Sequence, residues 1–82
     1  MRKAYVLIQA EMGSAEAVAG SLRDKPGVVA ADVVTGPHDV IVIVQGVDAD
    51  AVARVVINDI QTTKGVSHTT TYMAVGSNNR EE

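Results

Sequence analysis

The chain opens on a short, mainly apolar and partly β-branched run, followed by a segment with helical periodicity. Residues 4–10 read Ala-Tyr-Val-Leu-Ile-Gln-Ala and lie shortly before Gly13, which predicts a first strand. Ser14 suits the N-cap of a helix, and Pro26-Gly27 ends that helix because proline cannot continue it. The apolar face of this helix is predicted at Ala15, Val18, Ala19 and Leu22.

The second half of the chain repeats this order. Residues 28–35 and 40–45 are rich in valine and predict two further strands. The run at 40–45 is apolar on both faces, as in a central strand that is covered on both sides. Asp48 is predicted to cap a second helix, and residues 66–75 predict a fourth strand. The apolar face of the second helix is predicted at Ala53, Val56, Ile57 and Ile60.

Two strand-helix-strand units of this length predict an α+β fold, the ferredoxin-like βαββαβ sandwich, as one domain over residues 1–76. In that fold four antiparallel strands form one sheet, and two helices cover one of its faces. The other face is bare and carries alternate residues of the valine-rich strands, so we expect the domain to dimerise through the sheet. Residues 77–82 predict a polar tail.

Composition strengthens the expectation of self-association. The 82 residues are dominated by small apolar types, and the only aromatic residues are Tyr5 and Tyr72, so the core of a lone domain is thin. Cysteine is absent, which excludes a disulfide and fits a reducing compartment. The formal net charge of −3 and the scattered basic residues argue against direct nucleic-acid binding. No apolar run approaches the length of a membrane helix, and we expect a cytoplasmic protein.

Two segments carry candidate chemistry, and each has two interpretations. The Gly36 to Asp39 segment is either a tight turn in which Asp39 binds nearby amides, or a ligand loop in which Asp39 receives an ammonium group. Thr69 and Thr71 share one face of a strand, either as ordinary β-formers or as hydroxyls offered to a polar ligand.

The two histidines do not form a recognisable catalytic or metal site. His38 and His68 lie far apart in the sequence, and a zinc site needs three or four ligands. His38 and Asp39 are neighbours, and neighbours on a strand point to opposite sides. We therefore expect no catalytic residue, no metal, no cofactor and no enzymatic activity.

The Thr35-Gly36 turn resembles a known family. A strand ending in Thr-Gly, two variable residues, an aspartate and an apolar strand resembles the ligand-binding domain of the Lrp/AsnC regulators, also called the RAM domain. Pro-Gly-Val at 26–28, Gly-Val at 65–66 and threonines two apart agree with this pattern, and the resemblance covers roughly residues 3–76. Because the chain begins at its first strand, it resembles the stand-alone members, which lack the helix-turn-helix domain.

The resemblance implies a role in transcriptional regulation of amino-acid metabolism. Members are dimers joined through their sheets, often in rings of four or five dimers, with an amino-acid effector bound between dimers. For this chain it implies a homodimer in an octamer or decamer, and a possible full-length Lrp-type paralogue as partner. His38 departs from the family, which often has a tyrosine before the aspartate. The implied ligand-binding residues are Gly36, His38, Asp39, Thr69 and Thr71.

Three alternatives stay open from the sequence. An ACT-type module has the same element order and binds amino acids at a glycine turn after the first strand, here residues 11–14. Replacement of Asp39 is expected to abolish binding in an Lrp-type site and to leave an ACT-type site intact. A dimeric-barrel enzyme usually lines its cavity with aromatic residues and histidines, which are scarce here. A purely structural oligomerisation module predicts the same assembly without a ligand.

Overall fold

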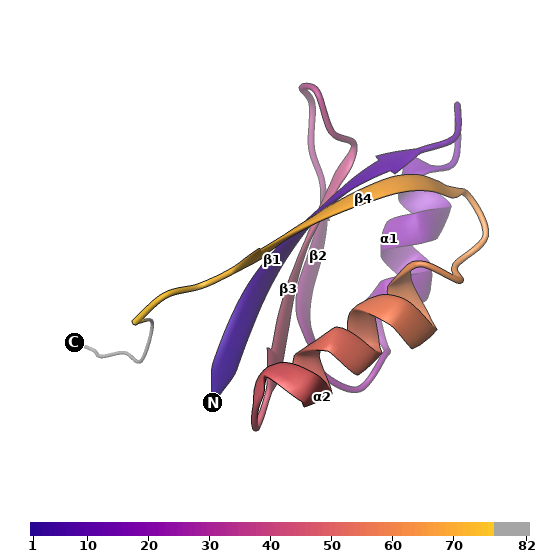
Figure 1. The fold of residues 1–82 in the computed structure, drawn as a ribbon. Helices are drawn as coiled ribbons and strands as arrows, with labels where there is room; N and C mark the ends of the chain where they lie inside the picture. The colour runs from indigo at the N-terminus through magenta and orange to yellow at the C-terminus, as the bar shows by residue number, and fades with distance from the viewer. Residues whose placement is uncertain (77–82) are drawn as a thin grey trace.

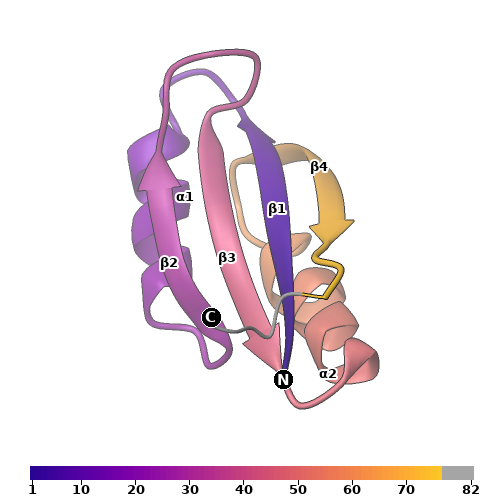
Figure 2. The same cartoon turned by 90° about the vertical axis from the view of Figure 1, so that its left-hand side faces the viewer.

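The computed structural model describes residues 1–76 and confirms the predicted βαββαβ order (Figure 1). Its sheet has the strand order β2-β3-β1-β4, and every neighbouring pair is antiparallel. Figure 2 shows the sheet with both helices behind it, so that one face is bare. The predicted tail at 77–82 lies outside the described residues. The elements are β1 Arg2–Ala10, α1 Ala15–Arg23, β2 Val28–Val33, β3 Val40–Gly46, α2 Ala49–Arg54, its π-helical continuation η1 Val55–Ile60, and β4 Val66–Met73.

The core lies between the sheet and the helices. Strand β3 is central, as predicted, and its alternate residues point to the helices while Ile41 and Ile43 point to the bare face. The packing is aliphatic throughout, with no aromatic ring in the core. Fully buried side chains come from both central strands and both helices: Val6, Ile8, Val40, Val42, Val44, Val18, Leu22, Val52 and Ile60.

Two predicted strands are longer than the observed ones. Strand β2 ends at Val33, because the backbone N–H of Val34 already donates to the carbonyl of Asp39 at 2.9 Å and the chain has begun to turn. Strand β4 ends at Met73 rather than at residue 75.

The predicted apolar face of the second helix is partly wrong. Val56 and Ile60 are buried, but Ala53 and Ile57 are exposed, with Ile57 retaining 57% of its accessible surface. The buried residues Val52, Val56 and Ile60 recur every four positions, which puts Ala53 and Ile57 one position past the buried stripe. Ile57 also lies in the π-helical stretch, in which the backbone N–H of Gln61 donates to the carbonyl of Val56, five residues earlier.

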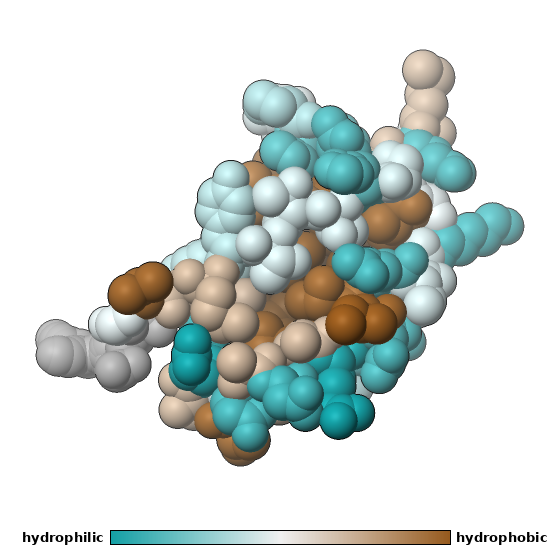
Figure 3. All heavy atoms as spheres, viewed as in Figure 1, coloured by the Kyte–Doolittle hydropathy of each residue, from teal (hydrophilic) through white to brown (hydrophobic). Residues whose placement is uncertain are grey.

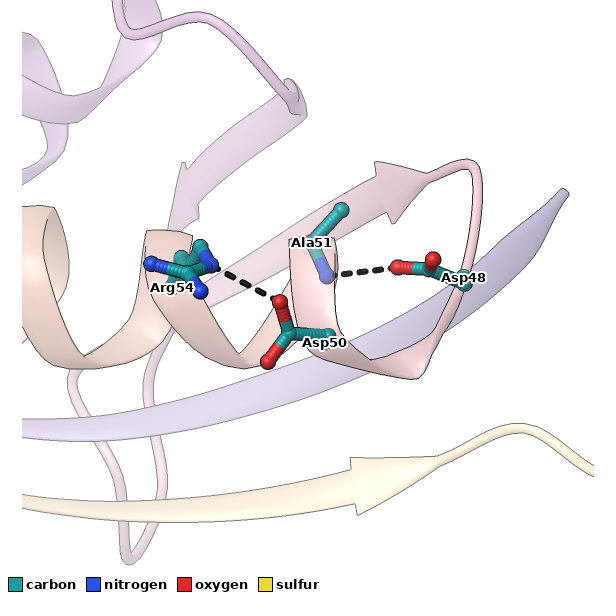
Figure 4. Close-up of polar contacts among 4 residues, drawn as sticks. All are labelled: Asp48, Asp50, Ala51 and Arg54. Atoms are coloured by element: carbon teal, nitrogen blue, oxygen red, sulfur yellow. Dashed lines mark hydrogen bonds and ion pairs between the residues drawn. The ribbon is translucent and has the colours of Figure 1, made fainter.

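The two predicted helix caps behave differently. Asp48 caps α2 as predicted, because its Oδ1 accepts a 2.8 Å hydrogen bond from the N–H of Ala51 (Figure 4). One turn further on, the Nε of Arg54 donates to Asp50 at 2.8 Å, and this hydrogen bond raises the pKa of Arg54. Ser14 occupies the N-cap position of α1, but its side chain makes no capping hydrogen bond. Its backbone is already in the helical region, whereas a capping residue is usually extended.

In the described part of the chain, no helix is long and apolar enough to cross a membrane.

Candidate functional site

Asp39 is half-buried, and its hydrogen bonds join the β2–β3 turn to the end of β1. Its Oδ2 accepts a 2.8 Å hydrogen bond from the backbone N–H of Ala10, and its own N–H donates to the carbonyl of Ile8 at 2.8 Å. The turn also requires glycine at position 36, where φ is +148°. The Asp39 side chain therefore binds a backbone amide, as in the tight-turn interpretation, but the amide belongs to β1 and not to the turn itself. No residue between 1 and 76 donates a hydrogen bond to its Oδ1.

Gly36 and His38 face the bare side of the sheet. They line a depression of about 370 Å³ together with Leu7 and Ile41, which are cross-strand partners on β1 and β3. Leu7 and Ile41 alternate with core residues along their strands, which places this depression on the face without helices.

Thr69 and Thr71 face the opposite, helix-covered side. They pair with Ile8 and Val6, whose side chains lie in the core. The Oγ1 of Thr69 accepts a hydrogen bond from Nε2 of Gln61 at 3.3 Å. Thr69 borders a depression of about 340 Å³ with mostly polar neighbours, whereas Thr71 borders a separate apolar groove of about 200 Å³.

A single chain does not bring the five predicted residues into one pocket. Asp39 and Thr69 lie at the same end of the sheet, because Ile8 pairs with Val40 on one side and with Thr69 on the other. Two strand spacings put their backbones about 10 Å apart. Gly36 and His38, however, lie across the sheet from both threonines, so one copy alone cannot bring all five to one small ligand.

The turn that an ACT-type module would use adjoins Asp39. A depression of about 360 Å³ at the β1–α1 turn is lined by Glu11, Gly13, Glu16 and Asp39, among others. Replacing Asp39 with alanine would remove the acceptor of the Ala10 amide beside this turn, and so would disturb both candidate sites. The predicted test with Asp39→Ala does not separate the two interpretations.

Sequence reasoning missed the residues that form the groove beside Thr71. Helical periodicity predicts Ala53 and Ile57 on the core face, yet both line the groove, together with Met73. The pattern hides them because apolar residues fill both the buried positions and the neighbouring ones, so periodicity alone does not tell which of them face the core.

Residues 1–76 contain no cluster of three or more histidines and carboxylates that is placed to hold a metal ion. His38 lies in the bare-face depression, and His68 lies with Thr69 on the depression near the start of β4.

The element order and the sheet define a small ferredoxin-like α+β domain with one bare sheet face. A family model described as the Lrp/AsnC ligand binding domain matches residues 3–80, and the chain belongs to this family. A comparison with curated proteins finds no significant match.

Solved structures agree with the family assignment. TTHA0845 from Thermus thermophilus is 30% identical over 98% of this chain and 100% of its own, with a TM-score of 0.89. Two regulators share the fold: AsnC of E. coli at 21% identity and a TM-score of 0.85, and NMB0573 of Neisseria meningitidis at 18% and 0.80. The match to AsnC covers 99% of this chain and 55% of AsnC, and that to NMB0573 covers 96% and 53%. The NMB0573 structure is a complex with L-Met.

Proposed function

We propose that this domain senses a free amino acid and acts in transcriptional regulation of amino-acid metabolism. The observation that carries the proposal is the family match over residues 3–80. The L-Met complex of the Neisseria regulator supports an amino acid as the class of effector. The domain works without catalysis and without direct nucleic-acid contact, in the cytoplasm, through ligand-linked self-assembly or through association with a full-length Lrp-type partner.

The effector site forms between copies of the chain. Gly36 and His38 lie on the opposite side of the sheet from Thr69 and Thr71, so the turn of one copy meets the threonines of another. A zwitterion needs an acceptor for its ammonium group and donors for its carboxylate. The Oδ1 of Asp39 supplies an acceptor, and the threonine hydroxyls supply donors.

The bare sheet face is the proposed dimer surface. Its centre is a row of cross-strand neighbours, in which Tyr5 pairs with Tyr72 on one side and with Ile43 on the other. Both tyrosines are exposed, at 37% and 59%. Exposed apolar surface of this kind commonly marks an interface. Dimers joined by this face then associate into rings of eight or ten chains.

A thermal-shift panel of the twenty amino acids, each at about 10 mM, tests the sensor. A ligand at a hundred times its Kd adds roughly 2.7 kcal/mol to the stability of the folded state. In a domain of this size that raises the midpoint by about ten degrees or more. Thr69→Val should lose the shift and Thr70→Val, on the opposite face, should keep it. If no amino acid shifts the native protein, the sensor proposal is wrong.

A further inference from the structure

The structure brings both histidines to the same end of the bare sheet face, although they lie far apart in the sequence. His68 is the cross-strand partner of Gln9 on β1. The Nε2 of Gln9 donates at 3.3 Å to the carbonyl of Pro37, the residue before His38. Gln9 lies two positions after Leu7, so Gln9 and His68 both face the bare side. One row across the sheet therefore contains the β2–β3 turn with His38, then Gln9, then His68.

His38 has apolar surroundings. It is half-buried and lines the depression of about 370 Å³ on the bare face. Most of the other side chains that line this depression are apolar: Leu7, Val34, Pro37 and Ile41. The imidazole therefore packs against apolar surface in a single copy, and in a dimer joined by the bare face the second copy covers it as well.

His68 has polar surroundings instead. It is exposed on the edge strand β4, beside Gln61, Ser67 and Thr69. Figure 3 shows pale and hydrophilic atoms over most of β4. A charge on His68 keeps its contact with water, which makes this residue the comparison for His38.

Among residues 1–76, no carboxylate lines the depression around His38. The nearby carboxylates of Asp39 and Glu11 line the separate depression at the β1–α1 turn, and Asp32 on β2 is exposed. The titratable group of β4 in the same row is His68, which is a cation when protonated, like His38. The other titratable side chains of the bare face lie further toward its opposite end: Lys3, Tyr5 and Tyr72. A protonated His38 therefore has no counter-charge within the depression.

We propose that protonation of His38 separates the copies that the bare face joins, so that assembly responds to pH between about 5 and 8. This inference rests on the dimer proposed above and adds its regulation. The second copy covers a neutral imidazole at little cost, whereas an imidazolium loses its water without gaining a partner. Because the dimer holds the neutral form, assembly is strongest above the range in which histidine titrates and weakens as the pH falls through it. Each dimer contains two copies of His38, so the effect counts twice.

Sedimentation equilibrium at about pH 7.5 and about pH 5.5 tests the proposal. The concentration at which half of the native protein is assembled should rise by at least about thirtyfold at the lower pH, because two imidazoles must be neutral in each dimer. His38→Gln carries no charge at either pH, so its assembly should differ by no more than about threefold. His38→Lys is a cation at both, and should sediment at the monomer mass of 8.6 kDa where the native protein is assembled.

His68→Gln is the matched control, since it makes the same substitution at the exposed histidine of the same row. It should keep the pH dependence of the native protein within about threefold, and circular dichroism at both pH values should show all variants folded. Native assembly that is equal at the two pH values, or equal effects of His38→Gln and His68→Gln, would overturn the inference while the dimer proposal stands. If the native protein sediments as single copies at the higher pH, the dimer and its regulation both fail.

Discussion

The carboxylate of Asp39 accepts a hydrogen bond from the backbone amide of Ala10 at 2.8 Å, although 29 positions separate the two residues. The bond lies just beyond the last pair of β1 with β3, which joins Ile8 to Val40. Because the ladder ends there, the amide of Ala10 needs another acceptor. Asp39 provides it, so a residue that resembles a ligand contact also holds the end of a central strand.

Replacing Asp39 with alanine should destabilise the fold. The substitution leaves the half-buried amide of Ala10 without its acceptor, which costs about 1–3 kcal/mol. In a domain of this size the melting temperature should fall by about 4–8 °C for each kcal/mol. Urea denaturation and thermal melts measure the change.

Asp39→Asn separates the structural role from the binding role. Asparagine keeps an acceptor oxygen for Ala10 and removes the charge, so its loss of stability should be less than half that of Asp39→Ala. Asp32→Ala, at an exposed position of β2, should change stability by no more than about 0.5 kcal/mol. A folded Asp39→Asn protein that still binds the effector at native affinity would remove Asp39 from the ammonium site.

The fold was predictable because several signals in the sequence agree. Three signals favour the same element order: the alternation of apolar and polar residues in the strands, the apolar run at 40–45, and the helix-ending Pro26-Gly27. The structure has this order, with the 40–45 run in a central strand. The position of the second helix was predictable from the sequence, but the side of the helix that is buried was not. Helical periodicity assumes a 3.6-residue turn, and Ile57 lies in a stretch with wider, π-helical turns.

The sequence suggests the candidate residues but does not predict how they are arranged. The sequence identifies Gly36, Asp39 and Thr69 one by one, and a period of two places Thr71 on the same face as Thr69. Which face that is depends on the pairing with Ile8, and strand register is a long-range property. The same limit hid the bond between Asp39 and Ala10.

The two helix starts look alike in sequence and should differ in energy. Asp48→Ala removes the hydrogen bond to the N–H of Ala51 and should destabilise the protein by about 1 kcal/mol. Ser14→Ala removes no capping bond and should change stability by less than about 0.5 kcal/mol. Urea denaturation of both variants checks this. Equal losses would mean that Ser14 caps α1 in solution.

Gly65 and Gly20 should respond in opposite directions to alanine. Gly65 has φ +97°, and a Cβ there would lie 3.0 Å from side-chain atoms of both Ser14 and Val18. Gly65→Ala should therefore cost about 1–3 kcal/mol. Gly20 is exposed within α1 and has no other atom within 4 Å of an added Cβ, so Gly20→Ala should stabilise by about 0.5–1 kcal/mol. Thermal melts with opposite shifts would confirm the pair, and shifts of the same sign would contradict it.

A charge on the bare sheet face should prevent dimerisation. Ile43 lies at the centre of that face, between Tyr5 on β1 and Ala30 on β2, and burying an unpaired carboxylate there is strongly unfavourable. Sedimentation equilibrium should therefore show Ile43→Asp at the monomer mass of 8.6 kDa and the native protein at a multiple of it. Val47→Asp is the control, since Val47 is 76% exposed in the turn between β3 and α2. It should keep the native mass. A native protein that sediments as a monomer, or an Ile43→Asp protein that retains the native mass, would show that the bare face does not join the copies.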